Sequence, residues 1–373
     1  MIYIAILIIL GVLAIGENYY SFKEYNQIYL EIKKYLNLKR IIYAVGGIFL
    51  ICFAGFRYYT GFDFGNYIKI FNDSAKGIRY PNIEITYYYL NLIISKLTSN
   101  YTWLFFLMAL VTLGVKFLFI ERINSKMKNT ILFSLFIYFS MYFLVYDMGQ
   151  IRSSFAQGMG LISMFLYLKG YKKLAIIPIL VGATIHNSCV ILFLLYVLGE
   201  KRLKVRTMII FYGAFLIIGQ FLNLNNISYL VSLTNNQAFI HKFSSYTTNP
   251  IFAKKIGLSL NLLFQACVLV LAILARCYFD IKDKKFDFML NMYLIGACLY
   301  LLFNNYFVLG VRLSAYFNLS IVFIIPKIVS MIKNKWIRML IVLGFTVVMS
   351  VMVLRELQVN GSIFLPYRMK FLW

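Results

Sequence analysis

The chain has 373 residues, of which 62% are hydrophobic and only 13% are charged, and its mean hydropathy is +0.78. A soluble protein of this size exposes more surface to water than so few charged residues could cover, so a soluble enzyme or binding protein is excluded. We therefore predict an all-α, polytopic integral membrane protein with about 10–12 transmembrane or half-membrane helices.

Apolar runs recur along the whole chain, and a helix needs roughly 20 such residues to cross the hydrocarbon of a bilayer. The predicted spans are 2–20, 41–56, 102–120, 130–146, 150–168, 207–222, 257–277, 286–303, 308–325 and 336–354. The first run lacks a basic leader and a small-residue cleavage site, so we interpret it as a retained span and not as a signal peptide. The spans leave no room for a soluble unit, which predicts a single integral membrane domain over residues 1–373.

The connectors between spans differ in charge, and this difference predicts their orientation. Most of the lysines and arginines lie in six connectors, at 21–40, 121–129, 169–173, 199–206, 278–285 and 326–338. Basic connectors face the cytoplasm in membrane proteins, so we expect these six to do so. Contact with anionic lipid then accounts for the net charge of +24 without a nucleic-acid partner. The loops at about 57–101 and 223–256 are expected on the extracytoplasmic side.

Residues 174–198 are a special case because basic connectors precede and follow them. A single crossing would place one of these connectors outside. The segment carries Pro178 and, in its middle, the polar stretch "GATIHNS". We interpret it as a hairpin of two short helices with His186 near its tip, since irregular backbone is tolerated inside a membrane protein beside a wet cavity. A single tilted crossing is the alternative.

Seven ionisable residues fall at or near the extracytoplasmic ends of the predicted spans. They are Arg57, Asp63, Glu84, Asp147, Arg152, His186 and Arg312. Charges at this depth are costly unless they pair with one another or line a wet cavity, so their gathering on one face predicts a polar site. The alternative for each residue is an interfacial anchor whose charged group reaches the lipid headgroups.

The chemistry of these residues favours an anionic, lipid-linked substrate. Arg57, Arg152 and Arg312 each carry a guanidinium, which can bind two phosphate oxygens at once. Arg152 also begins a predicted helix, whose amide groups favour a nearby anion. Most of the 30 tyrosines and 35 phenylalanines are explained by the aromatic belts that membrane proteins place at the bilayer surface.

Several stretches of the chain resemble the EpsG family, which belongs with the Wzy-like polymerases of bacterial O-antigen, capsule and exopolysaccharide. The matching stretches are "MIYIAILIIL", "FRYYTGFDFGNYIKIF", "GQIRSSFAQGMGLISMFLYLKG", "GATIHNSCVILFLLYVL", "VRLSAYFNLSIVFIIP" and "FLPYRMKFLW". Together they extend over nearly the whole chain. One departure is Phe62, where the family usually has a small residue before the aspartate.

The resemblance implies a glycosyltransferase of the GT-C type that joins undecaprenyl-diphosphate-linked oligosaccharide repeat units at the outer face of the bacterial cytoplasmic membrane. It implies metal-independent chemistry without a cofactor, and a chain-length regulator protein as a candidate partner. Arg152, Arg312 and then Arg57 are the expected diphosphate-binding residues. His186 or Asp63 is the expected base. Further expected substrate contacts are Glu84, Asp147, Tyr58 and Tyr67.

Three other classes of protein stay open at this point. A ligase that transfers a finished glycan would use the same donor and similar arginines. A flippase or polysaccharide transporter should carry charges open to both sides of the membrane, whereas the notable charges here lie on one side. An acyltransferase should place a histidine toward a cytoplasmic acyl donor. The sugars, the linkage, the anomeric outcome, the kind of polysaccharide and the oligomeric state are not predicted.

Overall fold

The computed structural model describes residues 2–20, 29–124, 130–233, 237–250 and 252–371. The protein is 78% helical, which confirms the predicted all-α class. The elements, in chain order, are α1 (Ile2–Tyr20), α2 (Tyr29–Gly55), β1 (Arg57–Tyr58), α3 (Phe64–Ala75), α4 (Ile85–Leu97), α5 (Thr102–Asn124), α6 (Ile131–Tyr138), the π-helix η2 (Phe139–Gly149), α7 (Ile151–Leu168), α8 (Ile176–Ile185), the 3₁₀-helix η3 (Asn187–Leu194), α9 (Leu195–Leu198), α10 (Val205–Phe221), the 3₁₀-helix η4 (Leu224–Ile227), α11 (Ser228–Ser232), α12 (Gln237–Thr248), α13 (Leu260–Tyr278), α14 (Lys284–Leu302), α15 (Phe307–Asn318), α16 (Ile321–Met331), α17 (Lys335–Val359), α18 (Gly361–Phe364) and β2 (Arg368–Met369).

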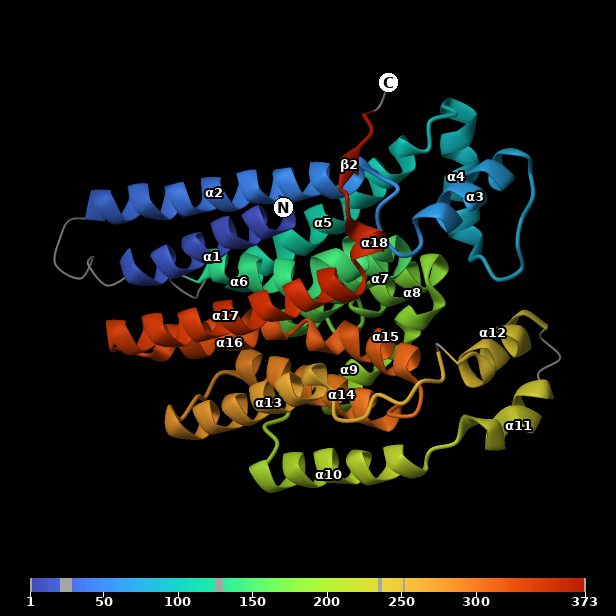
Figure 1. The fold of residues 1–373 in the computed structure, drawn as a ribbon. Helices are drawn as coiled ribbons and strands as arrows, with labels where there is room; N and C mark the ends of the chain where they lie inside the picture. Colours follow the sequence, from blue (N-terminus) through green and yellow to red (C-terminus); the bar gives the residue numbers. More distant parts are fainter. Residues whose placement is uncertain (1, 21–28, 125–129, 234–236, 251, 372–373) are drawn as a thin grey trace.

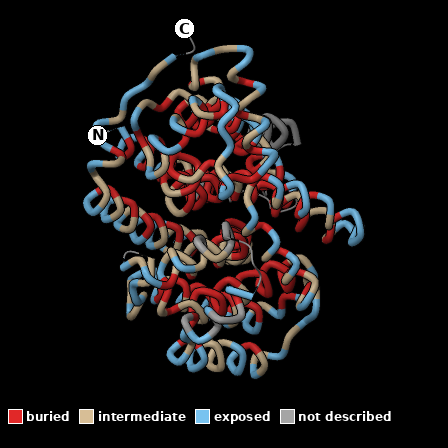
Figure 2. The backbone as a smooth tube through the Cα atoms, turned by 90° about the vertical axis from the view of Figure 1, so that its right-hand side faces the viewer, coloured by how far each residue is buried: buried red, intermediate tan, exposed pale blue. Residues whose placement is uncertain are grey.

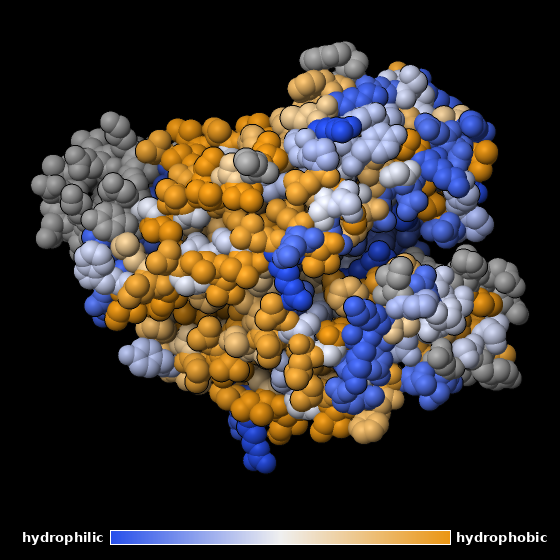
Figure 3. Space-filling view, viewed as in Figure 1, coloured by the Kyte–Doolittle hydropathy of each residue, from blue (hydrophilic) through white to orange (hydrophobic). Residues whose placement is uncertain are grey.

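The chain is a multi-pass membrane protein. In the described residues, 6 helices are long and apolar enough to cross a bilayer, or 7 with the bent pair α15–α16, and shorter apolar helices lie beside them. The helices run side by side as a bundle (Figure 1). Buried residues concentrate inside it (Figure 2). The side chains on the outside are largely hydrophobic over most of the bundle's length (Figure 3), as expected for a surface that faces hydrocarbon.

Two predicted boundaries differ from the structure. The span predicted at 41–56 belongs to α2, which begins at Tyr29, because the preceding residues include leucine, glutamate and lysine, which are good helix formers. The prediction of a single helix at 308–325 is wrong. These residues belong to two helices, α15 and α16, which are bent by 47° relative to each other. At this break the carbonyl of Phe317 accepts hydrogen bonds from both the hydroxyl of Ser320, over 2.8 Å, and its backbone N–H, over 3.1 Å.

The six basic connectors lie at one end of the bundle, which we call the basic end; its described residues include 39–40, 121–124, 169–173, 199–204, 279–285 and 332–338. Contacts link these connectors to one another. The guanidinium of Arg202 donates to the carbonyl of Ile281 over 2.6 Å, and Nζ of Lys327 lies 3.5 Å from the carboxylate of Asp283. This common location agrees with the predicted topology, in which all six face the same compartment.

The opposite end, which we call the site end, is formed by described residues within 57–101, 223–256 and 360–371. There α3 and α4 make one lobe, and α11 and α12 make another (Figure 1). The C-terminal strand β2 pairs antiparallel with β1, with Arg57 opposite Met369. The hydroxyl of Tyr3 also donates to the carbonyl of Phe364 over 3.3 Å, so both terminal regions are held at the site end.

Residues 174–198 form the predicted hairpin. Helix α8 ends at His186, which is extended with φ −151° and ψ 105°, and η3 and α9 return from there. The hydroxyl of Tyr196 donates to the carbonyl of Lys172 over 2.6 Å, so the two feet of the hairpin lie together at the basic end. Gly182 allows the arms to approach, because a Cβ at this position would overlap the sulfur of Cys189. The alternative of one tilted crossing is therefore wrong.

Candidate functional site

The side chain of Glu84 joins three segments at the site end. It precedes α4 and is only 3% exposed. Its Oε2 accepts a hydrogen bond from Nη1 of Arg152 at 2.5 Å, and its Oε1 accepts one from the backbone N–H of Asn187 at 3.2 Å. The same Oε1 lies 3.8 Å from Nδ1 of His186. The carboxylate thus sits between a fixed guanidinium and an imidazole that becomes cationic when it takes up a proton.

Breaks in the helices place these side chains. The π-helix η2 ends at Gly149, Gln150 is non-helical, and α7 begins at Ile151, so Arg152 stands in the first turn of a new helix. His186 stands at the break between α8 and η3. Backbone breaks of this kind are costly inside a membrane and are often found at functional sites. They bring residues that are distant in sequence to one location.

Aromatic rings surround the Arg152 guanidinium. Its central carbon lies 5.4 Å from the centre of the Tyr87 ring, a cation–π distance. Burial raises the pKa of Tyr67 to about 12, with Asp63 adding to the increase and Arg152 opposing it. The arginine side chain is 20% exposed, and its Nε has no hydrogen-bond partner within the described part of the chain. These contacts therefore hold Arg152 in place, and part of its side chain stays accessible.

A second charged cluster lies deeper in the bundle. Nζ of Lys116, on α5, is 3.0 Å from the carboxylate of Asp147, and it donates to Ser154 at 2.7 Å and to Gln157 at 3.4 Å. The hydroxyls of Tyr138 and Ser154 also donate to Asp147. The side chains of Lys116 and Asp147 are 0% and 2% exposed. This cluster is closed, because each of the three ammonium protons has an acceptor.

Lys116 was missed by the sequence analysis, although a signal was present. It is a single lysine inside the span predicted at 102–120, with apolar residues on both sides. An ionisable residue within a transmembrane helix indicates a buried partner or a functional role. Asp147, by contrast, was predicted at a span end and as a substrate contact, whereas the structure buries it against Lys116.

Arg57 lies beneath the surface, with 1% of its area exposed. It donates to the carbonyls of Ala54 at 2.5 Å and Thr60 at 3.2 Å, and it packs over the Phe105 ring at 4.6 Å. Burial lowers the pKa of this guanidinium to about 10. These contacts fix the loop that leads from α2 into α3. For a diphosphate to reach Arg57, this loop would have to move.

Asp63 stands at the start of α3 and is half-buried. The structure shows no ion pair between Asp63 and Arg57, both of which are described; Arg57 instead donates to backbone carbonyls. The preceding Gly61 has φ +107°, and a Cβ there would overlap the carbonyl of Met148, so only glycine fits against the end of η2. Tyr58, in β1, is half-buried beside Tyr59.

Arg312 stands on α15, apart from the Glu84 group. Its Nη1 donates to the hydroxyl of Tyr246, on α12, over 3.1 Å, and its Nε has no partner among the residues that the structure describes. Helix α15 contacts the returning arm of the hairpin, since the hydroxyls of Ser188 and Tyr316 lie 2.8 Å apart. Arg312 therefore belongs to the same end of the bundle as His186.

The surface between the two lobes is hollowed and hydrophilic (Figure 3). The structure therefore brings Glu84, Arg152, His186 and Tyr67 together, and it places Arg312 on a second element at the same end. Arg57 and Asp147 lie buried below, and Asp63 and Tyr58 lie on the connecting loop. Their roles stay predictions.

The model of one protein family, described as the EpsG family, matches residues 40–369, which is nearly the whole chain. The chain belongs to the EpsG family. The match confirms the resemblance drawn from the sequence stretches, and all residues of the site discussed above fall within it. No match was found among curated proteins or among solved structures. Membership of the EpsG family supports a general role as a polymerase in polysaccharide biosynthesis, with glycosyltransferase-like chemistry.

Proposed function

We propose that this EpsG-family protein joins undecaprenyl-diphosphate-linked oligosaccharide repeat units at the outer face of the bacterial cytoplasmic membrane. The observation that carries the proposal is the meeting of Arg152, Glu84 and His186 at the end of the bundle opposite the basic connectors. If the basic end faces the cytoplasm, as the charge distribution predicts, this group lies on the exterior side.

The reaction requires two kinds of group. A sugar hydroxyl of the acceptor attacks the anomeric carbon of the donor, and the bond from that carbon to the diphosphate oxygen breaks. Undecaprenyl diphosphate leaves with the bonding electrons, and the hydroxyl proton passes to a base. Cations are therefore needed at the diphosphate, where negative charge develops, and a proton acceptor is needed at the hydroxyl.

Arg152 and Arg312 are suited to the first requirement. Each lies at the site end and carries a guanidinium, which can bind phosphate oxygens through two parallel hydrogen bonds, and the Arg152 side chain is 20% exposed. Arg152 is held by Glu84 on one side and the Tyr87 ring on another, so little side-chain freedom is lost when a phosphate binds.

His186 is suited to the second requirement. Its imidazole is 13% exposed, and its Nδ1 lies 3.8 Å from the Glu84 carboxylate. A negative charge at this distance favours the protonated imidazole, so Glu84 stabilises the cation that forms when His186 accepts the proton. In this arrangement Glu84 positions and polarises the base, while His186 contacts the acceptor hydroxyl.

The proposal is tested with purified protein in vesicles that contain lipid-linked repeat units. We expect glycan chains of increasing length and release of one undecaprenyl diphosphate for each bond formed. In cells, deletion of the gene should leave single repeat units attached to their final acceptor. Unattached long chains in the deletion strain would instead indicate a ligase, and accumulation of repeat units on the cytoplasmic side would indicate a flippase.

A further inference from the structure

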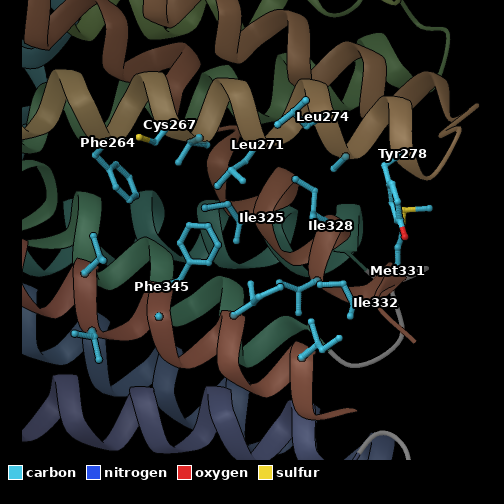
Figure 4. A pocket seen from close by; sticks show the side chains of 18 of the residues that line it. Phe264, Cys267, Leu271, Leu274, Tyr278, Ile325, Ile328, Met331, Ile332 and Phe345 are labelled. Atoms are coloured by element: carbon cyan, nitrogen blue, oxygen red, sulfur yellow. The ribbon is translucent and has the colours of Figure 1, made fainter. Parts of the chain in front are cut away.

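A large apolar groove runs along the outside of the bundle between α13 and α17, with α16 as its floor (Figure 4). Its volume is about 1500 Å³, which exceeds the range of about 300–1,000 Å³ that is typical of small-molecule pockets. Side chains of Phe264 and Leu271, from α13, and of Phe345, from α17, point into it. The lining extends from Leu260 to Tyr278, the full length of α13.

The groove has the length of the bilayer's apolar layer. Helix α13 contains 19 residues, which corresponds to roughly 28 Å at 1.5 Å per residue. The hydrocarbon of a bilayer is about 30 Å thick. The groove therefore opens toward lipid along its whole length and can take up a long apolar chain from the side.

A smaller cavity of about 110 Å³ lies beside this groove, and Phe264 and Met352 line both spaces. This cavity reaches α15, where Val311 and Ser314 line it on either side of Arg312. The hydroxyl of Tyr146, which also lines it, donates to the carbonyl of Val311 over 3.3 Å. Residues on either side of Arg312, a predicted diphosphate-binding residue, thus line a cavity that shares two wall residues with the groove.

The smaller cavity is mostly apolar, but a larger share of its lining is polar than in the groove. Gln265 lines it and is 7% exposed, and its Oε1 has no hydrogen-bond partner in the described ranges. An unpaired carbonyl oxygen inside a membrane protein is costly, and a hydroxyl group or a water molecule would satisfy it. A cavity with an unpaired polar group, next to an apolar groove, suits a molecule with a long hydrocarbon tail and a polar head.

We infer that the groove between α13 and α17 holds the polyisoprenoid tail of a lipid-linked substrate, whose diphosphate lies at Arg312. This inference rests on the proposed function for the identity of the head group, and it adds the site of the tail and the route of entry. In this arrangement the lipid-linked diphosphate approaches along α15, which carries Arg312, whereas Arg152 lies on the neighbouring helix α7.

Gly344 offers a direct way to block the groove. It lines the groove on α17, and no atom lies within 4 Å of a Cβ built at this position, so Gly344→Phe can fill the groove without displacing the protein. Gly213, on α10, has the same open surroundings but does not line the groove, so Gly213→Phe is the matched control. Both changes replace one helical glycine by the same ring.

The test uses an undecaprenyl diphosphate with a photoreactive diazirine on its tail, bound to the purified protein in nanodiscs. We expect labelled peptides from α13 and α17, competition by unlabelled undecaprenyl diphosphate, and no competition by phosphatidylglycerol at the same concentration. Gly344→Phe should reduce labelling about tenfold, because displacing as few as two chain carbons is sufficient for such a loss. Gly213→Phe should leave it unchanged. Equal competition by phosphatidylglycerol, or unchanged labelling in Gly344→Phe, would overturn the inference.

A second measurement separates this inference from the proposed reaction. With a substrate carried on undecaprenyl diphosphate, Gly344→Phe should raise KM, whereas with a substrate on a farnesyl carrier it should not. Groove labelling in a protein that forms no polymer would support the lipid site and contradict the polymerase proposal. Polymer formation with identical KM values in both glycine variants would support the polymerase and contradict the lipid site.

Discussion

The protein contains two cation–carboxylate pairs that look alike in sequence and differ in their surroundings. Arg152 and Glu84 meet at the site end, with side chains 20% and 3% exposed, and Lys116 and Asp147 meet inside the bundle, with 0% and 2% exposed. Each cation also lies 5.4 Å from the centre of a tyrosine ring. Lys116 has an acceptor for every proton, whereas Arg152 keeps Nε unpaired. The inner pair is therefore closed, whereas the outer pair is partly accessible to a ligand.

The largest expected effect is at His186, next to the outer pair. If His186 is the base, His186→Gln should lower the rate of polymerisation by roughly 10²–10⁴-fold per folded molecule. If the histidine only packs against the hairpin break, the same change should alter stability and leave the rate near the wild-type value. The measurement is polymer formation by purified protein, normalised to the monodisperse fraction on size exclusion.

Asp63→Asn is the matched comparison for that experiment, because Asp63 is the rival base and lies on the neighbouring loop. A normal rate in His186→Gln together with collapse in Asp63→Asn would transfer the role to Asp63. Normal rates in both variants would leave neither residue as the base, and leaving-group stabilisation by the arginines would then carry the reaction.

The inner pair should matter for stability. Lys116→Met leaves the Asp147 carboxylate buried without its cation, and breaking a buried pair in this way typically costs about 3–5 kcal/mol. We expect little folded protein and a much lower apparent melting temperature. The double variant Lys116→Met with Asp147→Asn removes both charges and should recover a large part of the loss. A single variant that melts like the wild type would show that the inner pair is not required for folding.

Substitution of Arg152 and Arg312 by lysine tests whether each guanidinium binds phosphate through two hydrogen bonds. Arg152→Lys and Arg312→Lys keep the charge but cannot make two parallel hydrogen bonds. Losing one charge-assisted hydrogen bond costs about 1.5–3 kcal/mol, so kcat/KM should fall roughly 10- to 150-fold. Arg79, between α3 and α4, is an exposed arginine, so Arg79→Lys is the control and should leave kcat/KM unchanged. Wild-type kinetics in both site variants would remove the arginines from diphosphate binding.

The fold was largely predictable from the sequence, because runs of about 20 apolar residues require helices when the surroundings are hydrocarbon. The hairpin was predictable for a similar reason, since basic connectors on both sides of 174–198 ruled out a simple crossing. The bend between α15 and α16 was not, because the residues at the break are themselves apolar or small and give no turn signal.

The sequence predicted which residues gather at the candidate site, but not which of them contact one another. The span ends identified Glu84, Arg152 and His186 together, but nothing in the sequence indicates that Glu84 pairs with Arg152, or that Arg57 is buried against Phe105. Those contacts depend on how α4, α7 and α8 pack, which local patterns do not determine. Lys116 lies inside a span and not at its end, so it does not belong to the set that the span ends define.

The smallest expected effects are at two tyrosines, Tyr138 beside the inner pair and Tyr87 beside the outer pair. They test whether each tyrosine acts through its hydroxyl or through its ring. The Tyr138 hydroxyl donates to Asp147, so Tyr138→Phe removes a donor from a buried carboxylate and should cost about 1–3 kcal/mol of stability. Tyr87 meets Arg152 through the face of its ring, which phenylalanine keeps, so Tyr87→Phe should leave both the melting temperature and kcat/KM nearly unchanged. Tyr87→Leu removes the ring and should weaken substrate binding by about 0.5–2 kcal/mol. Thermal melts and kinetics of the three variants test this together. A loss in Tyr87→Phe as large as that in Tyr138→Phe would mean that the outer tyrosine also acts through its hydroxyl, and that the two pairs are built in the same way.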